Sequence, residues 1–425
     1  MSSILTNNSA MIALQTLNTI NKNLTTVSKE ISTGFKVGSA KDNAAVFAIS
    51  QVMRSDVKGF EAISESLSLG QSTVAVASDA AKGIGDLLLD IKKKIVTAGE
   101  NNVDRAKIQD EVASLVNQVS SIASAAQFNG LNLLNNGKVV ADGAAVTTAN
   151  IVANKGSQAN SVLASLDRGS DQTVSTASIT VNKQDLTNRA GAAGTGTDLA
   201  AAAFTVSGAA AAALGSTATL TVVGDVATAA RGGNRVLAGD SYTIGGLTGV
   251  TGAVRYVARD GDSVNDIAAG IAERINLQAA ADGIKLTASV SGAAITLTNN
   301  TGAAVTATST LTTGGTTSGG LETLSLIDVS TEEGATAALS AIEGLIQTTT
   351  NAQAALGTSE SRIEIQNEFM GALIDSFKSG IGSLVDANME EAAARLQALQ
   401  VQQQLGTQAL SIANQAPQSI LALFR

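Results

Sequence analysis

The sequence contains no cysteine, no histidine and no tryptophan, and it has a single proline among its 425 residues. Without cysteine no disulfide can form, and without cysteine and histidine the usual zinc sites and the Ser-His-Asp or Cys-His catalytic groups are excluded. Aromatic residues make up 2% of the chain, although ligand pockets are usually lined by aromatic and large apolar side chains. We therefore expect no cofactor and no enzyme, and only chemistry based on two carboxylates stays open.

The sequence also lacks the features of membrane insertion and of nucleic acid binding. No window reaches the roughly 18 uninterrupted apolar residues of a membrane-spanning helix. The first residues, MSSILTNNS, have no basic stretch and no unbroken apolar run, so no cleavable signal peptide is expected. With 27 basic and 36 acidic residues the net charge is −9, unlike that of a basic nucleic-acid-binding protein.

Composition divides the chain into three parts. Residues 1–140 are rich in Leu, Ile, Val, Lys, Asp and Asn, residues 141–330 in Ala, Gly, Thr, Ser and Val, and residues 331–425 in Gln, Glu, Leu and Ala. The two outer parts have helical periodicity, and the middle part has short strand patterns separated by Gly and Asn. The sequence therefore predicts an α+β multidomain protein.

The first part contains two heptad seams. Apolar residues alternate at steps of three and four through residues 10–31 and again through residues 108–126, with Asp104 as the N-cap before the second seam. Residues 43–69 and 72–97 have less regular helical patterns. The first seam consists of Ala10, Ala13, Leu17, Ile20, Leu24, Val27 and Ile31.

The last part continues this style. A stripe from Met370 to Leu384 is followed by a second stripe that is displaced by one residue, as in a helix held to a near-3.5 repeat. The second stripe consists of Val385, Met389, Ala392, Leu396 and Leu399. Because lone helices are marginal in water, we expect the terminal helices to pair with each other and with copies of themselves. The acidic last part also suits a partner with the basic run at residues 92–94.

The middle part is predicted to be β-rich. The pattern of residues 235–310 is strand, strand, helix, strand, strand, and its helix runs through Ile267, Ile271 and Ile275 with Asp262 as the cap at its start. The four strands are predicted at residues 240–244, 253–257, 285–290 and 294–298. Loops or loosely packed edges are predicted for the Ala/Gly/Thr/Ser runs at residues 190–215 and 301–320.

A search for chemical sites finds little. Four aspartates, Asp240, Asp260, Asp262 and Asp266, could offer oxygens to Ca²⁺. Since Asp262 has the position of a helix cap and the others suit turns, we expect no metal site. The basic run at residues 92–94 has no aromatic neighbours on which bases could stack, which favours a solvated helix face or an intersubunit contact. Turns are predicted at the Asn-Gly pairs 129–130 and 136–137.

Three segments resemble the bacterial flagellin family. Residues 31–49, ISTGFKVGSAKDNAAVFAI, resemble the pattern LSTGxRINSAKDDAAGxAI, and residues 127–130 match the family's QFNG. Residues 413–425, ANQAPQSILALFR, resemble the flagellin terminus ANQxPQxxLxLLR. The small module at residues 235–310 resembles one inserted in flagellins and hook-associated proteins. The motif residues are Ser32, Thr33, Gly34, Ser39, Ala40, Asp42, Ala44, Ala45, Gln127, Phe128, Asn129, Gly130, Ala413, Asn414, Gln415, Pro417, Gln418, Leu421, Leu423 and Arg425.

The resemblance implies a structural protein that polymerises into the extracellular flagellar filament for swimming motility, after unfolded export by the flagellar type III apparatus. The long terminal helices would pair as coiled coils in the filament core, and the β-rich insert would face outward. Implied partners are other copies of the chain, an export chaperone, the export apparatus, and hook-associated junction and cap proteins. The implied segments are an inner-core helix and turn at 1–42, outer-tube helices at 43–140, a variable surface-exposed insert at 141–330, an outer-tube helix at 331–384 and an inner-core helix at 385–425.

The first motif also predicts a local conformation. By the resemblance, residues 32–49 form the turn into the outer-tube helices, and Gly34 is expected to adopt a backbone angle that other residues avoid. The motif departs from the family pattern at Gly38, Asn43 and Val46, where Asn, Asp and Gly are usual. These departures are expected to change local contacts between subunits while leaving the family resemblance intact.

A second departure concerns recognition by a mammalian surface receptor. Flagellins sensed by that receptor resemble QRVREL, whereas residues 89–94 of this chain read LDIKKK. Asp90 reverses the charge of the usual Arg and Lys94 replaces the usual Leu, although Glu111 matches the sensed type. The resemblance therefore implies weak or absent receptor activation.

Three other functions compete with a filament subunit. A hook–filament junction protein shares the paired terminal helices, but the ANQAPQ ending at residues 413–418 favours flagellin. A surface adhesin or glycan-binding role carried by the Thr/Ser-rich insert is a second alternative, and ligand binding by residues 141–330 alone would distinguish it. An enzyme carried by the insert, such as a protease or glycosidase, is the third alternative. A zinc protease of the HExxH type is excluded by the absence of histidine, and a pair of catalytic carboxylates stays open.

Overall fold

The structure, a computed structural model, describes residues 7–136, 159–168, 173–194, 204–207, 215–222, 236, 238–259 and 261–423. The chain divides into two compact units. The terminal unit comprises Met1–Glu65, Arg168–Val174 and Asn367–Arg425, and the central unit comprises Ser66–Asp167 and Ser175–Gln366. None of the helices in the described ranges combines the length and apolar character needed to cross a bilayer.

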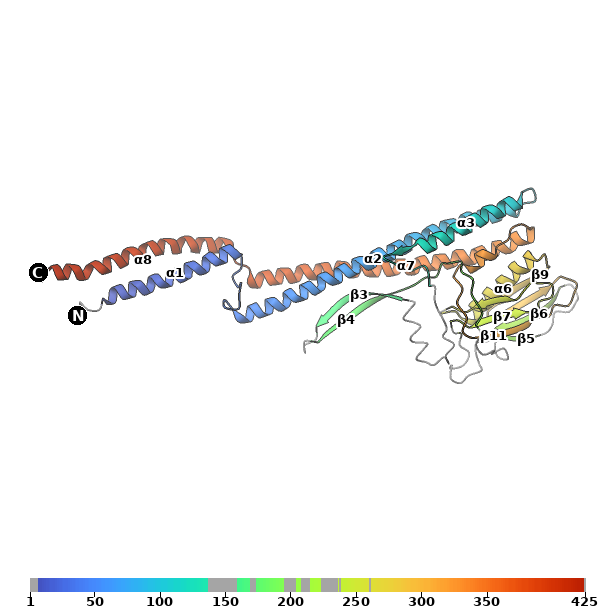
Figure 1. Ribbon diagram of the computed structural model, residues 1–425, viewed down its shortest axis with the longest axis horizontal. Helices are drawn as coiled ribbons and strands as arrows, with labels where there is room; N and C mark the ends of the chain where they lie inside the picture. The colour runs from blue at the N-terminus through green and yellow to red at the C-terminus, as the bar shows by residue number, and fades with distance from the viewer. Residues whose placement is uncertain are drawn as a thin grey trace. The chain divides into compact units, whose positions relative to one another are not determined.

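In the terminal unit, helix α1 (Asn8–Thr33) and helix α8 (Met389–Leu423) lie side by side (Figure 1). Every seam residue predicted between residues 10 and 31 is buried or half-buried in α1, as the alternating spacing requires. The Asn7 side chain donates to the Ala413 carbonyl oxygen at 2.8 Å, and the Gln403 side chain donates to Asn21 Oδ1 at 2.8 Å. The two helices therefore contact each other along most of their length.

The C-terminal seam is interrupted by a turn. Helix α7 (Glu332–Val385) ends before α8 begins at Met389, so the second stripe is divided between two helices and does not follow one continuous helix. Val385 and Ala392 are buried, and Leu396 and Leu399 are half-buried. Met389, in the first turn of α8, is 46% exposed and does not follow the predicted seam in the single chain.

The two breaks in the helices of the terminal unit pair with each other. Gly34, which ends α1, has φ +74, which confirms the predicted left-handed conformation. Its carbonyl oxygen accepts from the Ala387 N–H at 2.9 Å, and the Lys36 N–H donates to the Val385 carbonyl oxygen at 2.7 Å. Phe35 forms an isolated antiparallel bridge with Asp386. The turn after α1 is thereby attached to the turn between α7 and α8.

Helix α2 (Ala44–Ala98) crosses from one unit into the other, and its first part packs against the end of α7 within the terminal unit. The rings of Phe60 and Phe377 meet edge to face with centroids 5.4 Å apart. Glu61 pairs with Lys378 at 3.1 Å. Most of the predicted stripe on α7 is buried or half-buried here, with Leu384 as an exception at 41% exposed.

In the central unit the helices differ from the prediction at one point. The expected helices at 43–69 and 72–97 are one continuous helix, α2, because Gly70 costs little in a helix that is packed along its length. Helix α3 (Arg105–Ala125) begins at the predicted N-cap Asp104, whose side chain accepts from the Lys107 N–H. The buried face of α2 in this unit is Leu67, Val74, Ala77, Ala81, Ile84, Leu88, Ile91 and Ile95.

Two hairpins follow α3. The first joins β1 (Gln127–Phe128) to β2 (Leu131–Asn132), and its turn has Asn129 at φ 50 and Gly130 at φ 80, as the Asn-Gly pair predicts. The pair at 136–137 extends outside the described residues.

The second hairpin joins β3 (Ala159–Arg168) to β4 (Val174–Asn182). It approaches α2 at Gly70, where an added Cβ would lie 2.7 Å from Val162 Cγ1. The Gln366 side chain of α7 donates to the Ala164 carbonyl oxygen at 2.9 Å. Gly70, which lies between the two expected helices, therefore allows the hairpin to pack closely against α2.

Among the described residues from Phe204 to Thr312, the insert contains two small sheets and helix α6 (Val264–Ala281). Its strands are β5 (Phe204–Ser207), β6 (Ser216–Val222), β7 (Ser241–Gly245), β8 (Val254–Val257), β9 (Leu286–Ser291), β10 (Ala294–Asn299) and β11 (Thr308–Thr312). One sheet has the order β5-β6-β10-β9 and the other β11-β7-β8, and neighbouring strands in both sheets are antiparallel. Helix α6 lies beside the strands of the insert (Figure 1). It buries Ile267, Ile271 and Ile275 in the core shared with both sheets. The predicted order of strands and helix is confirmed.

Two details of the insert were predicted wrongly. The N-cap of α6 is Ser263, which forms a capping box with Asp266, and not Asp262. Asp262 instead accepts from the Tyr256 hydroxyl at 2.7 Å and from the Arg259 N–H at 2.8 Å. The run at 301–320, expected to be loop or edge, contains β11 and a buried segment from Thr317 onward. Short Thr- and Gly-rich strands give little periodic signal, and long-range pairing decides their structure.

Candidate functional site

Helices α1 and α8 each have apolar residues on two sides. One side forms the seam that the helices share, and large apolar residues on the other side of each helix stay exposed within the single chain. The exposed residues are Met11 63%, Ile12 65% and Leu14 50% on α1, and Val401 55%, Leu405 58% and Ile412 69% on α8. Large apolar side chains gathered on an exposed surface mark interaction sites. The geometry of this pair therefore supports binding to another protein surface.

The motif residues after α1 form the turn and the start of α2. Asp42 accepts from the N–H groups of Gly38 and Ser39 at 3.2 and 2.9 Å and from the Ser39 hydroxyl at 2.9 Å. These hydrogen bonds, with Ser39 the largest contributor and the Lys29 ammonium a smaller one, lower the pKa of Asp42. Asn43 Oδ1 accepts from the N–H of Ala45 at 3.1 Å, so Asn in place of the usual Asp keeps the acceptor for the first turn of α2.

The hydrogen bonds of Asp42 predict a pH dependence of this turn. Because the folded pKa lies below the ordinary value of 3.8, the stabilisation is present above 3.8 and is lost as the pH falls through the lowered pKa. Hydrogen exchange of the Gly38 and Ser39 amides, corrected for intrinsic rates, should accelerate only in that acidic range. In Asp42→Asn the acid step should be absent. Equal acid steps in both proteins would contradict the prediction.

The other motif residues differ in their surroundings. Ser32, Thr33, Ala40, Ala44 and Ala45 are exposed, while Gln127 to Gly130 form β1 and its turn. The Ala413 carbonyl oxygen accepts from Asn7, whereas Asn414 and Gln415 are exposed. Pro417, Gln418, Leu421 and Leu423 belong to α8, and Arg425 lies outside the described residues.

Residues 89–94, which the resemblance relates to receptor recognition, lie on α2 with a mixture of exposed and buried side chains. Asp90 is exposed, and Lys94 forms an ion pair with Glu111 of α3. Lys92 pairs with Glu343 of α7 at 2.5 Å, so the basic run does contact the acidic last part of the chain. Glu111, which matches the flagellins that the receptor senses, therefore forms an ion pair within the chain.

Of the four aspartates considered as Ca²⁺ ligands, the three that the structure describes do not form a common site. Asp262 binds Tyr256 and Arg259, and Asp266 accepts from Ser263 in the capping box. Asp240 is buried, and Asp260 lies outside the described residues. Over the part of the chain that the structure describes, no group of three or more Asp, Glu, His or Cys residues could hold a metal ion.

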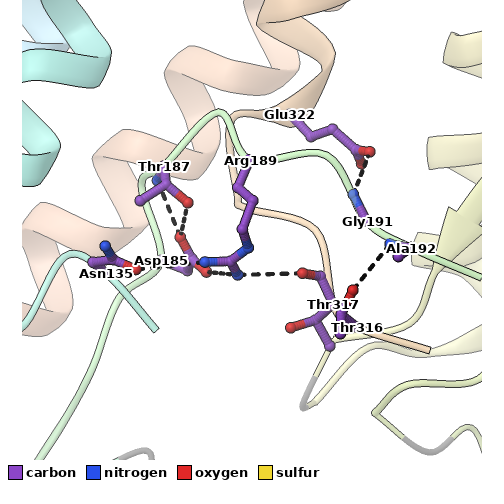
Figure 2. Close-up of polar contacts among 9 residues, drawn as sticks. All are labelled: Asn135, Asp185, Thr187, Arg189, Gly191, Ala192, Thr316, Thr317 and Glu322. Atoms are coloured by element: carbon purple, nitrogen blue, oxygen red, sulfur yellow. Dashed lines mark hydrogen bonds and ion pairs between the residues drawn. The ribbon is translucent and has the colours of Figure 1, made fainter. Parts of the chain in front are cut away.

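A polar cluster between the helices and the insert was not predicted. Asp185 Oδ1 accepts from the Thr187 N–H and hydroxyl at 3.0 and 2.6 Å, and Arg189 Nη2 donates to Asp185 Oδ2 at 3.1 Å (Figure 2). Arg189 also donates to the Thr317 carbonyl oxygen at 3.2 Å. In the sequence, this cluster is indicated by a few charged residues close to stretches of Gly, Ala and Thr, namely Asp185, Arg189 and Glu322.

Comparison with known proteins identifies the family. Residues 4–138 match the bacterial flagellin N-terminal helical region and residues 339–424 the bacterial flagellin C-terminal helical region. Flagellin A of Rhizobium meliloti is 33% identical over 443 residues, and flagellin of Brucella melitensis biotype 1 is 30% identical over 426 residues, with all of both chains covered in each case. Among solved structures, FliC from Burkholderia pseudomallei is 17% identical and has a TM-score of 0.31, covering 69% of this chain and 99% of that chain.

The comparisons confirm the resemblance predicted from the sequence motifs. A hook–filament junction protein is less supported, because the curated relatives that span the whole chain are flagellins. The matched N-terminal region contains α1 and the matched C-terminal region contains α8, and these two helices contact each other. The chain therefore belongs to the bacterial flagellin family, whose members are structural subunits that self-polymerise into the extracellular flagellar filament.

Proposed function

We propose that this flagellin polymerises through the pair of α1 and α8. The seam residues of both helices hold the pair together, and the exposed apolar residues of each helix contact neighbouring copies. The observation that carries the proposal is that large apolar residues of both helices, including Ile12 and Ile412, stay exposed while the seam between the helices is closed. Burying such side chains in neighbouring subunits would supply the free energy of assembly.

We propose the following division of labour along the chain. Residues 1–42 and 385–425 form the inner core of the filament, residues 43–140 and 331–384 the outer tube, and residues 141–330 the exposed insert. A contact between different surfaces of identical subunits gives an open helical polymer and not a closed ring. The distinct exposed faces of α1 and α8 suit such a contact.

Export and partners are a separate part of the proposal. The chain would pass unfolded through the flagellar type III apparatus with a chaperone, and its polymer would meet junction and cap proteins at its ends. The absence of cysteine and the single proline are compatible with threading of an unfolded chain. The role is purely structural, without catalysis.

The test compares the intact chain with two truncated chains by negative-stain electron microscopy. One truncated chain lacks residues 1–31 and the other lacks residues 400–425. After addition of sheared filament seeds, the intact chain should form long filaments and neither truncated chain should do so. Filaments from either truncated chain, or persistent monomers of the seeded intact chain, would count against assembly through α1 and α8.

We infer further that the chain activates the mammalian surface receptor weakly or not at all. Exposed Asp90 presents a negative charge where sensed flagellins have Arg, and Lys94 occupies Glu111 in an ion pair. Reporter cells should respond little to the wild-type protein, and Asp90→Arg with Lys94→Leu should raise the response. A wild-type response at concentrations typical of a strong agonist would refute this inference.

A further inference from the structure

The chain enters and leaves the two-sheet part of the insert, from β5 to β11, through two segments that lie against each other. We call residues 183–194 and 313–322 the neck. Ala192 and Thr316 form an antiparallel bridge with N–H to carbonyl oxygen distances of 3.1 and 3.0 Å. Closer to the helices, the Gly320 N–H donates to the Asp185 carbonyl oxygen at 3.0 Å. The two connections therefore form one hydrogen-bonded structure.

Glycine residues allow the close approach of the two segments. An added Cβ on Gly319 would lie 2.0 Å from the Thr187 carbonyl oxygen, and one on Gly320 would lie 2.1 Å from the Asp185 carbonyl oxygen. Neither distance leaves room for a side chain. These glycines are therefore required by contact across the neck.

The neck is also attached to the helical part of the central unit. The Gln184 N–H donates to the Leu133 carbonyl oxygen at 2.8 Å, and the Leu186 N–H donates to the Leu134 carbonyl oxygen at 3.0 Å. Leu186 is 1% exposed. This end of the neck is consequently fixed by backbone hydrogen bonds and by burial.

At the insert end, Glu322 joins three elements. Its Oε1 accepts from the Gly191 N–H at 2.9 Å (Figure 2), and its Oε2 forms an ion pair with Arg274 of α6. Glu322 itself begins the 3-10 helix η2 (Glu322–Leu326), which leads towards α7. One carboxylate thus contacts the incoming segment, the insert helix and the outgoing segment.

Arg274 is held in position from its other side. Its Nη1 donates to the Gly270 carbonyl oxygen at 3.0 Å, and its guanidinium lies over the Tyr256 ring at 4.7 Å. The Tyr256 hydroxyl donates to Asp262, and burial raises the pKa of Tyr256, so this hydroxyl keeps its proton. The side chain of Arg274 is 5% exposed and that of Glu322 13%. Breaking such a pair on one side leaves a buried charge without compensation.

We infer that Glu322 is a positioning residue that fixes the insert to the neck, so that the insert projects from the helical part in one orientation. Gly191, Arg274 and Glu322 form the latch. Without it, the insert would remain folded around its own core and would be held by fewer contacts, among them the bridge near Ala192, the Gly315 N–H to Gly239 carbonyl bond and a hydrogen bond between the Glu273 and Thr323 side chains. The inference does not depend on which residues form the polymer contacts.

The test uses Glu322→Gln in the full chain, with Glu343→Gln as the matched control. Glu343 pairs with Lys92 on the exposed surface of the helices, so its loss should change little. In Glu322→Gln, hydrogen exchange in the neck around Gly191 should rise at least about tenfold, since a charged acceptor is lost. Trypsin should cut after Arg189 faster by a similar factor, while exchange in α1 and α8 stays at the wild-type rate.

Assembled filaments supply a second readout. Electron cryomicroscopy of Glu322→Gln filaments should show weaker insert density than wild type and unchanged core density. Because filaments still form, failure of the latch and failure of assembly through α1 and α8 are distinguishable. Unchanged exchange, cleavage and insert density would overturn the inference.

A second variant guards against unfolding caused by the unpaired Arg274 charge. Arg274→Met combined with Glu322→Leu removes both charges and leaves an apolar pair, which buried sites often tolerate. Exchange within α6 should stay slow, whereas exchange around Gly191 should again rise, because its acceptor is gone. Wild-type protection around Gly191 in this variant would equally overturn the inference.

Discussion

Replacing Leu24 by Ala, or Leu396 by Ala, is expected to abolish filament growth or to reduce polymer yield sharply. Both side chains are half-buried on the seam between α1 and α8, and the proposed filament contacts would bury them further. Truncating a fully buried leucine typically costs ~2–5 kcal/mol. Every subunit carries the change, and a loss of about 2.7 kcal/mol per subunit would raise the critical concentration about 100-fold. The measurement is the amount of polymer pelleted from seeded solutions at one total protein concentration.

Val290→Ala is the control for these seam variants. Val290 is 39% exposed on β9 of the insert and is not part of the terminal unit. Its truncation should leave the polymer yield at the wild-type value. Wild-type yields from both Leu24→Ala and Leu396→Ala would show that the seam does not carry assembly.

Gly320→Ala and Gly344→Ala are expected to change stability in opposite directions. The added Cβ at Gly320 would lie 2.1 Å from the Asp185 carbonyl oxygen, so the neck must shift, at a cost of about 1–3 kcal/mol or more. The added Cβ at Gly344, exposed on α7, meets no atom within 4 Å. Since alanine is a better helix former, that change should stabilise by about 0.5–1 kcal/mol.

Thermal and urea unfolding of the two full-length variants measure this contrast. Local hydrogen exchange around Asp185 adds a direct readout, because it should rise in Gly320→Ala and stay constant in Gly344→Ala. Equal stability of Gly320→Ala and wild type would mean that the neck rearranges freely. In that case the close packing of its two segments would not constrain the insert.

The helical part of this fold could be predicted because its pattern is local. The seam from Ala10 to Ile31 repeats every few residues, and Asp104 and Gly34 mark helix ends by their own chemistry. The prediction failed between the two expected helices, 43–69 and 72–97, because Gly70 is tolerated within one long packed helix. Tertiary contact with Val162 explains that residue better than propensity does.

The polar contacts of the insert and the neck could not be predicted in the same way. Gly191, Arg274 and Glu322 are separated by tens of residues, and no spacing in the sequence relates them. The cap of α6 was assigned to Asp262 when the adjacent Ser263 forms it, because two capping residues stand side by side. Asp262 instead accepts a hydrogen bond from the nearby Tyr256 hydroxyl, a contact that the sequence pattern does not reveal.

The pairing of α1 with α8 makes polymerisation a check on complete synthesis. Asn7 and Ala413, which share a hydrogen bond, are 406 positions apart in the sequence. A chain whose translation stops before Met389, or that is clipped there, keeps the α1 seam but has no helix to cover it. If subunits join through this pair, as we propose, such a fragment lacks the joining surface, and the growing polymer would exclude incomplete chains without a separate proofreading enzyme.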